Sequence, residues 1–198
     1  MNRRSLILGL VALPMVLSLS SCRSSGRSDK LVVVPRSQWA PLGSMPPAKS
    51  TPMGSISRIT VHHDGIEPIT PLETYDQIQS RLQTIRKYHL ARGWADIGYH
   101  YIIDPRGRVW MGRPLQLQGA HVSGGNDGNI GILLLGNFQF EQPSDEALES
   151  LSILIGKLQK KYRIPAGRIY GHCELAVGTE CPGHHLKDKM GAIRRKAR

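Results

Sequence analysis

Two segments of the chain have the composition of buried β-strands, and they constrain the fold more than any other feature. Residues 57–63 (SRITVHH) are rich in β-branched side chains, and residues 129–136 (NIGILLLG) are almost continuously apolar. Strands of this kind are buried on both faces, which requires helices on both sides of the sheet. The sequence therefore predicts an α/β domain with a central mixed β-sheet flanked by helices.

Two segments with helical periodicity are candidates for those helices. A capping-box pattern at Thr70–Glu73, with proline at the first helical position, predicts a helix that continues to about Ala91. Ser144 is the expected N-cap of a second helix, whose apolar face runs to Tyr162. The residues from Leu186 onward are compatible with a last short helix.

Two shorter strand segments complete the expected sheet. Residues 98–104 (GYHYIID) and 108–112 (RVWMG) flank the turn sequence DPRG, which predicts a β-hairpin. Neither an internal repeat nor a domain boundary is visible after the N-terminal region. We therefore expect a single domain over residues 31–186, with its chemistry at the ends of strands.

The first 21 residues have the order of a secretory signal. Arg3 and Arg4 form a basic start, and an apolar run from Leu6 to Leu19 leads to small residues before Cys22. The run is shorter than the roughly 20 apolar residues that a membrane-spanning helix needs. A signal peptide over residues 1–21 is therefore the expected assignment.

The residues around the expected cleavage site resemble a bacterial lipobox. The sequence LSSC ends at Cys22, and this resemblance implies cleavage before Cys22 and attachment of lipid to it. Residues 22–30 would then be a lipidated, flexible tether. Arg23 follows where an aspartate would suggest inner-membrane retention, so we expect the outer membrane where the envelope has two membranes. The alternative is an ordinary signal peptide followed by a chance cysteine.

The chain carries a formal net charge of +11, which favours an anionic partner. An exported protein rarely meets nucleic acid, so we expect no nucleic-acid partner. Peptidoglycan and anionic lipid headgroups are the polyanions outside the cytoplasmic membrane. Residues 187–198 carry much of the excess charge, and we expect them to form a solvated basic tail.

A dense group of metal-capable side chains lies between Gly171 and Leu186, where three histidines and two cysteines occur. A catalytic zinc site needs three protein ligands and one open position. His172 and Cys181 are the candidates from this segment, and His62 at the end of the strand 57–63 is the third. Cys173 allows a rival interpretation, a Cys173–Cys181 disulfide, which an exported protein could form. His63 points away from His62 because side chains alternate along a strand.

Four ordered motifs together resemble the N-acetylmuramoyl-L-alanine amidase type 2 family, which includes peptidoglycan recognition proteins and phage amidase-type lysozymes. They are TVHHDG (60–65), RGWADIGYHYIIDPRGRVWMGR (92–113), GAHVSGGNDGNIGILLLGNF (119–138) and GHCELAVGTECPG (171–183). The resemblance covers nearly all of residues 31–186. It implies a zinc-dependent amidase that cleaves between the lactyl group of N-acetylmuramic acid and L-alanine of the stem peptide. A peptidoglycan-binding lipoprotein without catalysis is the alternative.

The resemblance also implies roles for individual residues. His62, His172 and Cys181 match the zinc ligands of the family. Tyr99 matches the tyrosine that contacts the scissile carbonyl or the attacking water, and Thr179 matches the threonine of the recognition-protein version of the last motif. Tyr and Thr hydroxyls can donate hydrogen bonds to a tetrahedral oxyanion.

Further matches concern the substrate. Gly93, Trp94 and Arg113 match an arrangement that goes with diaminopimelate-type stem peptides, where an arginine fork suits the extra carboxylate. The alternative is that Trp94 packs on the sheet and Arg113 is solvated. His121 and Asn126 match positions that line the family's groove, although structural roles in turns are equally compatible with the glycine-rich surroundings.

Overall fold

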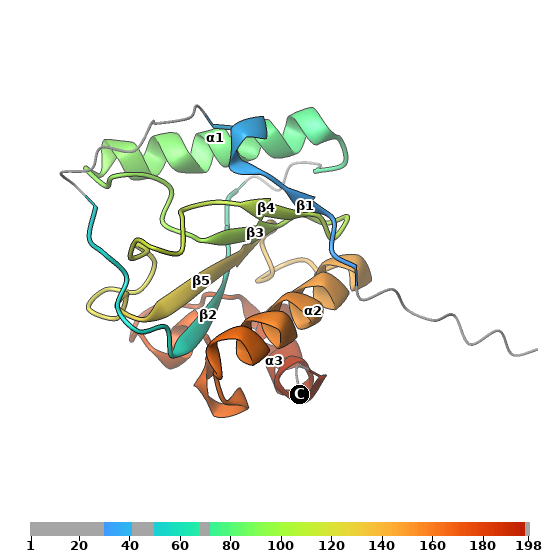
Figure 1. Ribbon diagram of the computed structural model, residues 1–198. Coiled ribbons are helices and arrows are strands. Elements are labelled where there is room, and N and C mark those ends of the chain that lie inside the picture. Colours follow the sequence, from blue (N-terminus) through green and yellow to red (C-terminus); the bar gives the residue numbers. More distant parts are fainter. Residues whose placement is uncertain (1–29, 41–49, 68–71, 197–198) are drawn as a thin grey trace, which may run out of the picture.

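A six-stranded mixed β-sheet runs through the centre of the protein (Figure 1). The computed structural model describes residues 30–40, 50–67 and 72–196. The strands follow the order β1, β4, β3, β5, β2, β6 across the sheet. Their bounds are Val33–Val34 (β1), Arg58–His63 (β2), Tyr101–Ile103 (β3), Val109–Met111 (β4), Asn129–Leu134 (β5) and Ile169–Gly171 (β6).

The sheet combines one hairpin with parallel neighbours. Strands β3 and β4 are antiparallel, which confirms the predicted hairpin, whereas β2 is parallel to both β5 and β6. Asp104 organises the hairpin turn, because its Oδ1 accepts hydrogen bonds from the backbone N–H groups of Arg106 and Arg108, each at 3.0 Å. The indole of Trp110 donates to Oδ2 of the same carboxylate at 2.8 Å. The predicted α/β architecture is confirmed.

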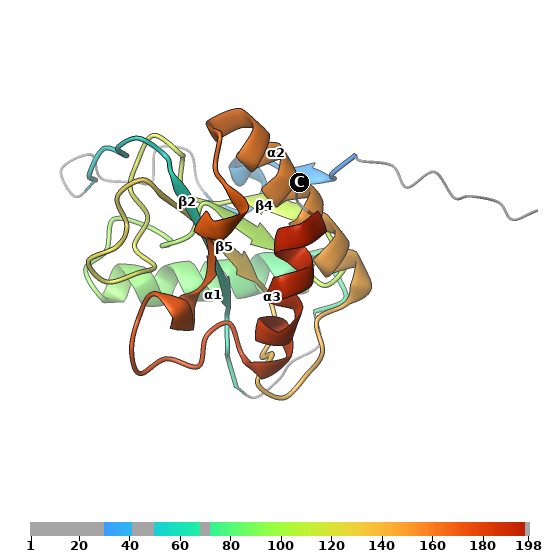
Figure 2. The same cartoon turned by 90° about the horizontal axis from the view of Figure 1, so that it is seen from below.

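Helices cover both faces of the sheet. Helix α1 (Tyr75–Ala91) lies over one face, and α2 (Asp145–Tyr162) and α3 (His184–Lys196) lie over the other (Figure 1). Seen from below, α3 lies beside α2 (Figure 2). No helix within the described residues is long and apolar enough to cross a membrane. The predicted signal peptide, Cys22 and nearly all of the tether lie outside the described residues.

Helix α1 begins later than the sequence pattern predicted. Thr74 is its N-cap: the Thr74 side chain accepts from Gln77 N, and the Gln77 side chain accepts from Thr74 N at 2.9 Å. This is a complete capping box, whereas Glu73 precedes the helix and Thr70 lies outside the described residues. Two adjacent sequences, residues 70–73 and 74–77, fit the box pattern, and the second one forms the cap.

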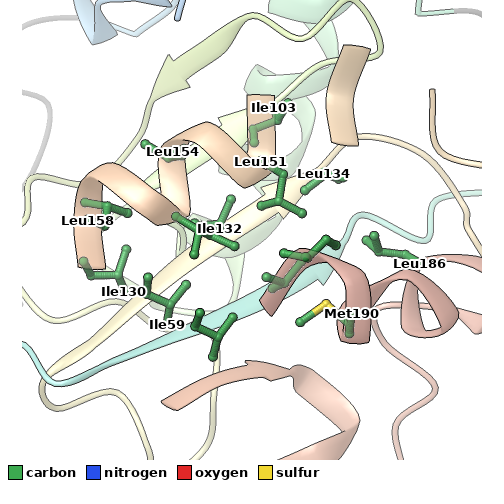
Figure 3. Packing of buried hydrophobic residues seen from close by; sticks show 14 of the residues in the cluster. Ile59, Ile103, Ile130, Ile132, Leu134, Leu151, Leu154, Leu158, Leu186 and Met190 are labelled. Carbon is green, nitrogen blue, oxygen red and sulfur yellow. The ribbon is translucent and has the colours of Figure 1, made fainter. Parts of the chain in front are cut away.

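The alternation of side chains along the central strands divides the core into two layers. Ile59 and Val61 of β2 face α2 and α3, so the intervening Thr60 and His62 face the side of α1. Figure 3 shows the larger layer, in which strand residues pack against both helices. The labelled members are Ile59, Ile103, Ile130, Ile132 and Leu134 of the sheet, Leu151, Leu154 and Leu158 of α2, and Leu186 and Met190 of α3.

The short helix expected from Leu186 onward is present as α3, whereas the prediction of a solvated basic tail over residues 187–198 is wrong as far as Lys196. Leu186, Met190 and Ile193 of α3 are buried in the same core layer, and lysines such as Lys189 occupy the solvent face. The buried positions recur with helical spacing, so the charges belong to the polar face of an amphipathic helix. The packed domain therefore extends through α3.

Candidate metal centre

The predicted metal-binding histidines meet at one edge of the sheet. His62 lies near the end of β2, and His172 directly follows β6 and opens the 3₁₀ turn η4 (His172–Glu174). Because neighbouring parallel strands end at the same edge, residues far apart in sequence arrive side by side. The two imidazole ring centroids are 4.6 Å apart.

A loop after η4 returns Cys181 to the same edge. The backbone N–H of Cys173 donates to the carbonyl of Cys181 at 2.7 Å, which closes the loop. The chain then turns through a cis peptide bond between Cys181 and Pro182 and through Gly183, whose φ is 86°. A Cβ on Gly183 would lie 2.5 Å from the carbonyl carbon of Phe138, so this position accepts only glycine.

The geometry of the three candidate ligands fits a tetrahedral zinc ion. One ligand atom from each of His62, His172 and Cys181 can be chosen so that all three lie within 4.8 Å of one another. The His62 Nδ1 to Cys181 Sγ distance is 3.6 Å. Zn–S and Zn–N bonds of about 2.3 and 2.0 Å at a tetrahedral angle would separate these atoms by about 3.5 Å.

Cys173 and Cys181 are both free thiols, so the rival disulfide is not formed. Cys173 is half-buried. Cys173 begins the loop that Cys181 ends, and its tie to Cys181 runs through the backbone. The thiol of Cys181 thereby remains available to a metal.

Burial keeps the candidate ligands uncharged in the metal-free protein. Desolvation lowers the pKa of His62 well below 6.5, with further lowering by His121 and His172, and it also lowers the pKa of His172. Burial raises the pKa of Cys181 to about 12, although the backbone N–H of His63 lowers it. Neutral imidazoles are ready to bind a metal, whereas the thiol has to release its proton when one binds.

The two candidate catalytic hydroxyls lie close to the ligands. The ring of Tyr99 is centred 5.2 Å from that of His62. Burial raises the pKa of Tyr99 above its usual value, so its phenol stays protonated and can donate a hydrogen bond. The Oγ1 of Thr179 accepts from the backbone N–H of Cys181 at 3.2 Å, which leaves the hydroxyl proton of Thr179 to donate elsewhere.

A pocket of about 320 Å³ lies beside Tyr99, between α1 and the ends of β2 and β5. Its lining residues are Asp64, Ile66, Thr84, Ile85, Tyr88, His89, Tyr99 and Leu133. Tyr99 lines the pocket, and its ring is centred 5.2 Å from that of His62. The pocket therefore lies beside the metal-binding edge of the sheet.

Asp64 is a feature of this pocket that the sequence pattern did not assign. Its Oδ2 lies 3.2 Å from Arg81 Nη1, and its Oδ1 accepts from the backbone N–H of Gly136 at 3.2 Å. Burial raises the pKa of Asp64 to about 6, even though Arg81 lowers it. The sequence did contain one signal for Asp64: it directly follows His62 and His63 at the end of a strand.

The three residues expected to select the stem peptide differ in how far they are exposed to solvent. Gly93 is exposed and Trp94 is half-buried, with its ring 4.5 Å from that of His89. Arg113 is only 6% exposed, so the alternative of a solvated arginine is wrong. Its guanidinium donates to the carbonyls of Asp96, Ile97 and Gln118 at 3.0, 3.0 and 2.7 Å. Arg113 thus holds the backbone around it, and pairing with a substrate carboxylate stays a prediction.

The side chains of His121 and Asn126 make contacts within the protein that agree with the structural alternative, and their contact with substrate stays a prediction. The Oδ1 of Asn126 accepts from the backbone N–H groups of His121 and Val122 at 2.9 and 3.0 Å, which holds a turn. His121 is buried, and its Nδ1 lies 3.0 Å from Nε2 of His62. Both side chains are therefore engaged inside the protein.

The family profile described as N-acetylmuramoyl-L-alanine amidase matches residues 52–184, which include all three candidate ligands. The chain belongs to this family. The family that the four motifs predicted is therefore confirmed, and the amidase fold is shared with recognition proteins.

Several members of this amidase family show how far the similarity extends. Peptidoglycan-recognition protein SC1a of Drosophila melanogaster is 31% identical over 180 residues, which cover 89% of this chain and 92% of that protein. The human N-acetylmuramoyl-L-alanine amidase is 30% identical over 166 residues, which cover 79% of this chain but only 27% of the human protein. The crystal structure of peptidoglycan recognition protein-LE superposes with a TM-score of 0.72 at 26% identity, over 81% of this chain and 93% of that one. That structure contains tracheal cytotoxin, a monomeric diaminopimelic acid-type peptidoglycan.

Proposed function

We propose that this protein is a zinc-dependent N-acetylmuramoyl-L-alanine amidase, which hydrolyses the amide between the lactyl group of N-acetylmuramic acid and L-alanine of the stem peptide. The observation that carries the proposal is the cluster of His62, His172 and Cys181, whose ligand atoms lie within 4.8 Å of one another. Three protein ligands leave a fourth position for water or substrate, which is the pattern of catalytic zinc sites. Membership of the amidase family supports the same reaction.

The residues around the cluster are suited to acyl transfer. Zinc, when bound, would polarise the scissile carbonyl and lower the pKa of its water to about 7. Tyr99 has a phenol that stays protonated, so it can donate to the carbonyl oxygen as negative charge develops there. We assign Thr179 as a second donor to the same oxyanion, because its hydroxyl proton is not used in the hydrogen bond that its oxygen accepts from Cys181 N–H.

We propose peptidoglycan with diaminopimelate-type stem peptides as the substrate. The complex of recognition protein-LE with a diaminopimelic acid-type fragment supports this choice, as do Gly93, Trp94 and Arg113 at the matching positions. We place the stem peptide in the pocket beside Tyr99, whose ring is centred 5.2 Å from that of His62. Rates on purified diaminopimelate-type and lysine-type muropeptides test this: equal rates on the two would contradict the proposed preference.

We further propose that the mature protein is exported and anchored to a membrane through lipid on Cys22, facing the cell wall. The order of basic, apolar and small residues before Cys22 supports this location. Labelling of a bacterial expression culture with tritiated palmitate should mark the wild-type chain and leave a Cys22→Ala variant unlabelled. Equal labelling of both chains, or of neither, would contradict lipidation at this residue.

Digestion of purified muropeptides, followed by mass analysis, tests the proposed reaction. Intact stem peptides with a free L-alanine amino terminus should appear together with the sugar that retains its lactyl carboxylate. Chelator treatment should abolish the release, and added zinc should restore it. Binding of muropeptides without release of stem peptides would favour a peptidoglycan-binding protein that lacks catalysis.

A further inference from the structure

The hydrogen bond between His62 and His121 raises the question of which ring carries the shared proton. The Nε2 of His62 and the Nδ1 of His121 are 3.0 Å apart, and both rings are buried. One proton lies between these two nitrogens, so one ring donates and the other accepts. If His62 accepts, its proton resides on Nδ1, and this atom cannot bind a metal.

The backbone carbonyl of Asn129 decides the direction. The Nε2 of His121 lies 3.2 Å from this oxygen, which can only accept a hydrogen bond. A neutral His121 therefore carries its proton on Nε2 and presents a lone pair at Nδ1. His62 then donates from Nε2, which leaves the lone pair of His62 on Nδ1. That atom is the one 3.6 Å from the Sγ of Cys181.

The protein is built closely around the His121 ring. A Cβ on Gly119 would lie 2.4 Å from Cδ2 of His121, and a Cβ on Gly131 would lie 2.6 Å from the same atom. Two glycines thus form a slot that admits the ring only because they lack side chains. The Asn126 side chain holds the backbone of His121 at 2.9 Å. The position and orientation of the ring are therefore imposed by its surroundings.

We propose that His121 is a positioning residue for the metal centre: it accepts the Nε2 proton of His62 and thereby holds His62 in the tautomer whose Nδ1 can bind zinc. The role follows from two consecutive hydrogen bonds: His62 donates to His121, and His121 donates to the carbonyl of Asn129. It deepens the proposed function, since it rests on His62 as a zinc ligand, and it assigns to His121 a role different from substrate contact. Partners of this kind fix the tautomer and orientation of metal-bound histidines, and their loss costs about 10- to 100-fold in metal affinity.

The first test measures the tautomer directly in the metal-free full chain. Two-bond ¹H–¹⁵N correlation spectra of protein labelled with ¹⁵N-histidine distinguish the Nε2–H form from the Nδ1–H form. Replacement of His62 by asparagine assigns its signals by their disappearance. We expect His62 and His121 both to be Nε2–H tautomers. A His62 that carries its proton on Nδ1 would overturn the proposal, whatever the activity of the enzyme.

Two substitutions separate the acceptor role from the space that the ring fills. His121→Asn places a carbonyl oxygen near the position of Nδ1, and His121→Phe keeps a ring without an acceptor. We expect zinc affinity about 10- to 100-fold weaker in His121→Phe, with most of the loss recovered in His121→Asn. Zinc dissociation constants are measured by competition with a chromogenic chelator.

His100 provides a matched control for the loss of a buried imidazole. Its ring is centred 5.9 Å from that of His121, and its Nδ1 and Nε2 contact Gly131 N and Leu117 O, each at 3.0 Å. His100→Phe should lower stability and leave zinc affinity within about twofold of wild type. Equal zinc affinity in wild type, His121→Phe and His121→Asn would overturn the positioning role. If His121→Phe does not fold, the wild-type tautomer measurement still decides.

These outcomes are distinct from those that test the proposed function. A chain that binds zinc, shows the Nε2–H tautomer of His62 and releases no stem peptide would contradict the amidase proposal and leave the role of His121 intact. A chain that cleaves muropeptides while His121→Phe binds zinc as tightly as wild type would keep the enzyme and remove the positioning role.

Discussion

The Sγ of Cys181 lies 3.6 Å from the Nδ1 of His62, although 119 residues separate them in the chain. The contact depends on two features of the fold. Strand β6 pairs in parallel with β2, and the loop after η4 is closed by the hydrogen bond between Cys173 N and the Cys181 carbonyl. The candidate metal centre is therefore a property of the folded sheet edge.

Replacement of Cys181 by serine should remove the metal. A serine hydroxyl does not ionise near neutral pH, so we expect zinc affinity to fall by more than about 100-fold and amidase activity to fall with it. Zinc content after dialysis, measured by atomic absorption, reports the change. Cys173→Ala is the matched control, because its tie to the loop is through the backbone, and it should retain a full equivalent of zinc. Retention of zinc and activity in Cys181→Ser would contradict the assigned ligand set.

Replacement of Tyr99 by phenylalanine should act on the reaction and leave the metal in place. The variant keeps the ring beside His62 and loses one donor to the developing oxyanion, so we expect kcat to fall by about 10²- to 10³-fold. KM and zinc affinity should stay within about twofold of wild type. Steady-state kinetics on a soluble muropeptide check this, and a change confined to KM would assign Tyr99 to binding instead.

The packing of α3 predicts unequal effects from two adjacent residues. Met190 is buried at 3% exposure, whereas Lys189 is exposed. Met190→Ala should lower the free energy of unfolding by about 2–5 kcal/mol, and Lys189→Ala should change it by less than about 0.5 kcal/mol. Urea denaturation monitored by circular dichroism measures both. Similar small effects would mean that residues 187–196 form a detachable tail after all.

The buried histidines predict a loss of stability in acid. Burial lowers the folded-state pKa of His100 to about 4, below the value of about 6.5 in the unfolded chain. The unfolded state therefore takes up the proton first, so the contribution of His100 is complete above pH 6.5 and is lost as the pH falls towards 4. It amounts to roughly 3 kcal/mol at most. Asp64 changes stability with pH in the opposite direction. Because burial raises its pKa to about 6, the folded state takes up the proton first, and this favours folding as the pH falls below 6.

Urea denaturation of the metal-free protein at pH 7 and pH 4.5 measures this dependence. The wild type should be less stable at pH 4.5, and His100→Phe should show a smaller difference between the two pH values because its side chain does not titrate. An equal difference in both proteins would show that protonation of His100 is not coupled to unfolding.

Much of the fold was predictable because the deciding patterns are local. The buried strand ending at His63, the hairpin around Asp104 and the helix capped by Ser144 all follow from short-range composition and turn chemistry, and all three are present. The start of α1 was misplaced because two neighbouring segments, residues 70–73 and 74–77, both fit the capping-box pattern, and the local pattern does not choose between them. The short C-terminal helix was expected, but its packing into the core was missed because the excess of basic residues suggested a solvated tail.

The sequence by itself determined the types of residue at the metal centre and the family to which the chain belongs, because motifs preserve chemistry and order. Only the tertiary structure decided how the other residues serve that centre. It turned Arg113 inward onto three carbonyls, and it placed His121 in a slot between two glycines, against His62. The physical reason is that burial, hydrogen-bond direction and tautomer depend on atoms brought together from distant segments, which no local pattern contains.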